Sequence, residues 1–130
     1  MSATNESSEN YLETILILSG RLPVVRSVDV ATELGFKKSS VSIAMKNLRL
    51  KNHITVSDAG YISLTESGRA IAEEIYERHK WISSWLISLG VNEQTATEDA
   101  CKMEHVISRE SFEAIKNHIH LNEDSTQKTE

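Results

Sequence analysis

A cysteine, a glutamate and a histidine stand close together near residue 100, and these three residue types are common ligands of transition metals. Cys101, Glu104 and His105 occupy positions i, i+3 and i+4, so on a helix they share one face. A thiolate, a carboxylate and an imidazole together suit a divalent transition ion. The competing interpretation is structural, because an isolated cysteine often behaves as a small buried hydrophobe.

Two other parts of the chain can bring further ligands to this triplet. His79 falls on the same helical stripe as Ile75 and Ile82, so we expect it to point inward. Asn10 and Glu13 stand at i and i+3 on the first predicted helix. Taken singly, an inward histidine is more often a satisfied core residue, and Asn10 and Glu13 are ordinary surface residues. A metal site therefore requires that these distant segments converge.

The elements that must position these residues follow from changes in the apolar period along the chain. The expected order is helices over about 8–19, 28–34 and 37–51, a hairpin over 54–64, and helices over 65–89, 93–107 and 108–120. Residues 1–7 are expected to be frayed, with Ser8 capping the first helix. The predicted fold class is mainly α with a small β-hairpin wing, a winged helix-turn-helix followed by a helical domain.

The third predicted helix carries residues suited to the major groove of DNA. Its candidate DNA-binding residues are Lys37, Lys38, Ser39, Ser40, Ser42, Ile43 and Lys46. Small hydroxyls allow close approach, lysines attract phosphate, and Ile43 can contact a thymine methyl group. Residues 21–51 carry seven basic and two acidic side chains, whereas the whole chain has a net charge of −5. The alternatives are a solvated basic face and a helix-turn-helix used only for protein contact.

Length and composition exclude several classes of protein. The chain has 130 residues, of which 39% are hydrophobic, so a core can form but a large multidomain enzyme is excluded. No apolar run is long enough to span a bilayer, no signal peptide is visible, and a single cysteine favours the cytoplasm. The sequence contains no nucleophile–base motif, phosphate loop or helical His-Glu-x-x-His pattern. We therefore expect neither an enzyme nor a small-molecule substrate.

Several motifs, taken in order, resemble one known family. The matching stretches are NYLE at 10–13, KSSVS at 38–42, ERH at 77–79 and DACKMEHVIS at 99–108. They are similar to the diphtheria toxin repressor family of metal-dependent transcriptional regulators over about residues 8–120. Within that family, the chain resembles the short, manganese-type branch without the SH3-like domain.

The resemblance implies a homodimer with a defined domain organisation. A winged helix-turn-helix DNA-binding domain is expected over 1–66, a helical metal-binding and dimerisation domain over 67–121, and a disordered tail over 122–130. The apolar candidates for the dimer interface are Trp81, Trp85, Ile87, Val106, Ile107, Phe112, Ile115 and Ile119.

The resemblance also assigns metal ligands to positions of this chain. Cys101, Glu104 and His105 match family ligands, His79 and Glu13 match ligands of the second or paired site, and Glu98 sits where some members place another. Position 10 is a ligand in the family, usually Met or Asp, and is Asn10 here. Ser83 falls where some iron-responsive members have Glu, which weakens an iron-type second site.

The expected function is a metal-activated repressor of manganese- or iron-uptake genes. One or two Mn²⁺ or Fe²⁺ ions per protomer would clamp the first helix onto the fourth and fifth, and so set the spacing of two recognition helices on a double-stranded operator. Two alternatives stay open at this point. One is a winged-helix regulator without metal control, and the other is a small metal-binding buffer protein or metalloenzyme.

Overall fold

Over residues 2–128 the chain forms six helices and one two-stranded hairpin, which confirms the predicted fold class. A computed structural model describes the backbone of residues 2–128 and the side chains of residues 7–120. The chain divides into two compact units, Met1–Tyr76 and Glu77–Glu130. None of the helices in the described part of the chain is long and apolar enough to cross a membrane.

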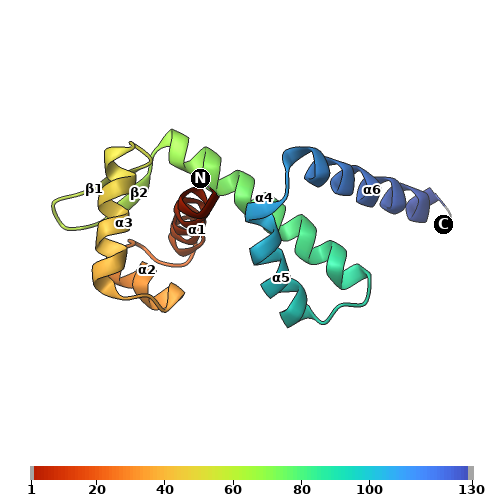
Figure 1. The fold of residues 1–130 in the computed structure, drawn as a ribbon, viewed down its shortest axis with the longest axis horizontal. Coiled ribbons are helices and arrows are strands. Elements are labelled where there is room, and N and C mark those ends of the chain that lie inside the picture. Colours follow the sequence, from red (N-terminus) through yellow and green to blue (C-terminus); the bar gives the residue numbers. More distant parts are fainter. Residues whose placement is uncertain (1, 129–130) are drawn as a thin grey trace. The chain divides into compact units, whose positions relative to one another are not determined.

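The first unit is a winged helix-turn-helix. Its elements are α1 (Ser2–Ser19), α2 (Ser27–Leu34), α3 (Lys38–Leu50), β1 (Ile54–Val56), β2 (Ile62–Leu64) and the start of α4 (Glu66–Ser88) (Figure 1). One core joins all of them, with Ile15, Val30, Val41 and Ile54 at most 1% exposed. Burying each such aliphatic side chain stabilises the fold by about 1.5–3 kcal/mol, so this core is what orients α3.

The turn between α2 and α3 depends on Gly35. Its φ of +70° lies in the left-handed region that glycine enters without steric cost, and its backbone N–H donates to Ala31 O. In α3, which follows this turn, one side of the helix is buried. Its buried residues are Val41, Met45 and Leu48, as their spacing predicts. The opposite side of α3 therefore faces solvent.

The hairpin is an antiparallel pair in which Ile54 faces Leu64 and Val56 faces Ile62. Val25 adds an isolated bridge to Ile62, whose N–H donates to Val25 O at 2.7 Å. The hairpin is thereby attached to the segment that leads into α2. Gly60, with φ of +85°, closes the tip.

The start of α4 is fixed against the end of α3 and the hairpin. Thr65 Oγ1 accepts from Gly68 N at 3.2 Å and donates to Asn52 O at 2.7 Å. A Cβ atom at Gly68 would lie 1.9 Å from His53 O, so only glycine allows the two segments to approach so closely.

The second unit contains the remainder of α4 with α5 (Glu93–Val106) and α6 (Arg109–Lys128). Ile82, Ala100 and Phe112, one from each helix, form its core. The Asn92 side chain caps α5 by accepting from Gln94 N and Thr95 N. The packing of these three helices thus determines where side chains of α4 and α5 meet.

Two predicted helix boundaries are wrong. α1 begins at Ser2, so Ser8 is not a cap, and α6 continues to Lys128 rather than ending near His120. Residues 2–10 and 121–128 contain neither Gly nor Pro, so nothing in the sequence stops either helix. The backbone over 122–128 is therefore helical where a disordered tail was expected. The predicted domain limits at 66 and 121 stay a prediction.

Candidate metal centre and nucleic-acid interface

A buried carboxyl group is the centre of the candidate metal site in the second unit. Glu104 on α5 is 0% exposed. Its Oε2 lies 2.9 Å from Nδ1 of His79 on α4, a hydrogen-bond distance. Burial of a carboxyl group costs several kcal/mol unless it is compensated, so its presence here needs a chemical reason.

His105 supplies a third donor to the same place. Its Nε2 lies 3.3 Å from Glu104 Oε1, and its side chain is only 4% exposed. Glu104 Oε1 nevertheless accepts no hydrogen bond from the residues that the structure describes. Buried polar atoms are nearly always satisfied, so this oxygen beside a second imidazole is suited to binding a cation.

This donor set fits a divalent transition metal. Two imidazoles and one carboxylate are hard-to-borderline ligands of the kind used for Fe²⁺, Zn²⁺ and Mn²⁺. His79, Glu104 and His105 were all predicted from the sequence, and in the structure each histidine lies beside a different oxygen of Glu104. Their role as metal ligands stays a prediction.

Arg78 positions this cluster, and sequence analysis missed it. Its Nη1 donates to the backbone oxygen of Glu104 at 3.2 Å and of Ile107 at 3.0 Å. Its guanidinium carbon lies 5.5 Å from the centre of the Phe112 ring on α6. Arg78 therefore holds the carboxyl end of α5 against α4, next in sequence to His79. The available signals were its position beside a predicted ligand and its place in the ERH motif at 77–79.

The remaining predicted ligands are Cys101, Glu98, Glu13 and Asn10. Cys101 and Glu98 are exposed on α5, one and two turns before Glu104. Glu13 and Asn10 belong to α1 of the first unit, where Glu13 is 5% exposed and Asn10 is half-buried. Their part in metal binding stays a prediction.

The candidate DNA-binding residues all lie exposed at the start and along one side of α3. They are Lys37, Lys38, Ser39, Ser40, Ser42, Ile43 and Lys46. Ile43 is 63% exposed, which is unusual for an isoleucine and leaves its side chain available for apolar contact. The arrangement is that of a recognition helix, whose roles in DNA contact stay predictions.

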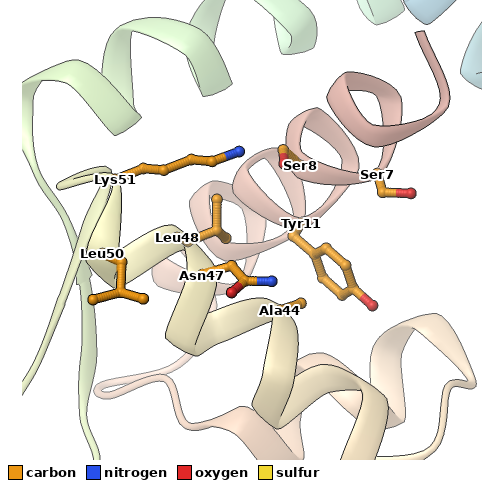
Figure 2. A pocket seen from close by; sticks show the side chains of 8 residues that line it. All are labelled: Ser7, Ser8, Tyr11, Ala44, Asn47, Leu48, Leu50 and Lys51. Carbon is orange, nitrogen blue, oxygen red and sulfur yellow. The ribbon is translucent and has the colours of Figure 1, made fainter. Parts of the chain in front are cut away.

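A cavity of about 600 Å³ lies elsewhere in the first unit, between α1 and the carboxyl end of α3 (Figure 2). It is lined by Ser7, Ser8, Tyr11, Ala44, Asn47, Leu48, Leu50 and Lys51. Figure 2 shows the Lys51 side chain extending toward Ser8. None of the predicted metal or DNA ligands lines this cavity, so it belongs to neither site.

Comparison with known families accounts for both halves of the chain. Residues 3–62 match the N-terminal DNA-binding domain of iron-dependent repressors, and residues 65–127 match their metal-binding and dimerisation domain. The chain belongs to the iron-dependent repressor family. This confirms the resemblance found in the sequence, and the repressor is a metal-dependent transcriptional regulator rather than an enzyme.

Named relatives of the repressor agree with this assignment. An uncharacterized HTH-type transcriptional regulator of Methanocaldococcus jannaschii is 35% identical over 114 residues, which cover 86% of this chain and 91% of the relative. The transcriptional regulator MntR of Escherichia coli O157:H7 is 32% identical over 111 residues, covering 85% of this chain and 72% of MntR.

Solved structures share the fold. A metal-dependent transcriptional regulator, MtsR, superposes with a TM-score of 0.81 at 24% identity and covers 87% of this chain. A manganese-dependent transcriptional repressor in complex with manganese superposes with a TM-score of 0.79 at 23% identity, also over 87% of this chain. The repressor spans only 53% and 52% of these two solved chains.

Proposed function

We propose that the repressor binds an operator as a homodimer when Mn²⁺ or Fe²⁺ occupies the Glu104 cluster, and that it controls genes for uptake of that metal. The observation that carries the proposal is the buried, incompletely satisfied carboxyl group of Glu104 between His79 and His105. A cation there would compensate the buried charge and bind only the folded state.

The choice between manganese and iron rests on the donor atoms and on the relatives. The solved manganese-dependent repressor is a manganese protein by its title, which favours Mn²⁺. A thiolate from Cys101 favours a softer ion, which in this pair is Fe²⁺. Because Cys101 and Glu98 are exposed, we assign them to an outer part of the site or to a second ion. The buried cluster then provides the first ion's ligands.

We keep Asn10 and Glu13 as proposed ligands from α1, on the strength of the family resemblance. Metal capture would then involve residues of both the DNA-binding domain and the dimerisation domain. An amide oxygen at Asn10 binds a cation more weakly than a carboxylate, so Glu13 would be the main contributor from α1. Bound metal supplies a positive charge that several separate segments of the chain share.

Exposed apolar side chains in the second unit support the homodimer. Ile87 is 43%, Leu89 63% and Val106 70% exposed. Phe112, predicted as an interface candidate, is 3% exposed and belongs to the core of the unit instead. Covering the exposed set with a second copy would place two α3 helices on one DNA duplex, in the cytoplasm where the operator lies.

The test is DNA binding with and without metal. A duplex is selected from a random-sequence pool in the presence of Mn²⁺, and its affinity is then measured by fluorescence anisotropy in EDTA, Mn²⁺, Fe²⁺ and Zn²⁺. We expect Mn²⁺ or Fe²⁺ to tighten binding at least about tenfold, the usual scale of allosteric coupling. Equal affinity in EDTA and in every metal would favour the winged-helix regulator without metal control. Metal binding with no DNA binding would favour the buffer protein.

A further inference from the structure

The hairpin over residues 54–64, which forms the wing of this repressor, contains no lysine or arginine side chain. Its tip carries Asp58. A wing that lies along a DNA backbone needs positive charge, because phosphate neutralisation supplies most of the sequence-independent affinity. Arg26 directly follows Val25, which forms a bridge to Ile62 of the hairpin.

The Arg26 guanidinium packs over an aromatic ring of the hairpin. Its guanidinium carbon lies 5.0 Å from the centre of the Tyr61 ring, and its Nη2 donates to the Tyr61 hydroxyl at 3.4 Å. The nearby Asp29 carboxylate is engaged elsewhere, since its Oδ2 accepts from the Arg26 backbone N–H at 2.9 Å. The ring therefore fixes the guanidinium plane without neutralising its charge.

Other arginines of the first unit are held differently. Arg21 pairs with Glu33 at 3.5 Å, and Arg69 pairs with Glu73 at 3.7 Å. Over the side chains that the structure describes, Arg26 has no carboxylate partner. An exposed, pre-oriented guanidinium whose charge is uncompensated is arranged to receive an external anion.

We propose that Arg26, held on Tyr61, binds a phosphodiester group of the DNA backbone beside the wing. The proposal rests on the proposed DNA-binding function. A guanidinium stacked by one face keeps most of its five N–H donors at its edge, where two of them match the oxygens of one phosphate. Such a contact positions the protein and reads no bases. It supplies at the base of the wing the charge that the acidic tip lacks.

The test compares Arg26→Gln with Arg69→Gln, a control that removes the same charge from an ion pair on α4. Affinity is measured over a range of salt concentrations for the selected duplex and for an unrelated duplex. We expect Arg26→Gln to weaken binding to both duplexes by the same factor, and to reduce the slope of log K against log salt concentration by about 0.9. Arg69→Gln should leave the slope unchanged.

A third variant tests the role of the ring. Tyr61→Leu keeps the charge of Arg26 but removes the ring and hydroxyl that hold its guanidinium. We therefore expect weaker DNA binding with the wild-type salt slope. Thermal melting of each variant establishes that it folds. Should Arg26→Gln melt early, Arg26→Lys keeps the charge and must restore the slope. A slope for Arg26→Gln equal to that of Arg69→Gln, or a loss confined to one duplex, overturns the phosphate assignment.

These outcomes are distinct from a failure of the metal switch. If DNA binding proves independent of metal, the salt slopes can still be compared in EDTA. If Arg26 contributes nothing, Mn²⁺ should stimulate the Arg26→Gln variant and the wild type alike.

Discussion

Replacing Glu104 with glutamine should separate metal binding from folding. The side chain keeps its shape, and an amide oxygen can still accept at the 2.9 Å distance to His79 Nδ1. The other oxygen, Oε1, has no hydrogen bond to lose and faces His105 Nε2 at 3.3 Å. We therefore expect the stability of the metal-free variant to stay within about 1 kcal/mol of wild type, the net value of one hydrogen bond.

The effect of metal on stability should change much more. A ligand present at 100 times its Kd stabilises the native state by about 2.7 kcal/mol. If loss of the carboxylate raises Kd about 100-fold, the same Mn²⁺ concentration stabilises Glu104→Gln by only about 0.4 kcal/mol. The wild-type protein should therefore show a Tm increase of several degrees that the variant lacks.

The assay is thermal denaturation by circular dichroism with EDTA and with Mn²⁺, at one protein concentration. Glu113→Gln, at an exposed position of α6, is the matched control and should retain the full Mn²⁺ effect. An unchanged Mn²⁺ effect in Glu104→Gln would refute the assignment of Glu104 as a ligand. A loss of more than about 3 kcal/mol in EDTA would show that its role is structural.

Three further substitutions test other parts of the account. Arg78→Met removes two hydrogen bonds from a charged donor to the end of α5. Unfolding in urea should therefore show a free energy of unfolding about 3–5 kcal/mol lower, and calorimetry an Mn²⁺ affinity about 10–100-fold weaker. Wild-type values for both would contradict the positioning role of Arg78. Gly68→Ala places a Cβ 1.9 Å from His53 O, so the melting temperature should fall by several degrees, whereas an unchanged Tm would show that α4 can shift freely. Val106→Asp puts a charge on a 70% exposed apolar position, and sedimentation should then show monomers where wild type is dimeric. If the variant stays dimeric, the dimer interface does not include Val106.

Local sequence patterns predicted most of the fold because the relevant signals are themselves local. Gly35 and Asn92 act within a few residues, and the buried stripe of α3 follows from its own period. Helix ends without a stop signal were missed, as at Ser2 and Lys128. Leu89 continues the apolar stripe of α4 but is 63% exposed, because it lies beyond the end of the helix where no partner packs.

The metal centre shows both the reach and the limit of such patterns. Helical spacing placed Glu104 and His105 together, and periodicity pointed His79 inward toward them. The same spacing put Cys101 on their face, yet it is exposed, because burial depends on which neighbouring helix covers each turn. Arg78 could not be assigned, since its acceptors are backbone oxygens 26 and 29 residues away. Contacts of that kind leave no mark in residue spacing.

Metal binding and DNA binding by the repressor should be coupled by a single coupling free energy. The most direct test is the Mn²⁺ affinity measured with and without the selected duplex. Linkage requires that DNA tighten Mn²⁺ binding by the same factor by which Mn²⁺ tightens DNA binding. We predict a matching factor of at least about ten in both titrations. An Mn²⁺ affinity that is identical with and without DNA would contradict the account.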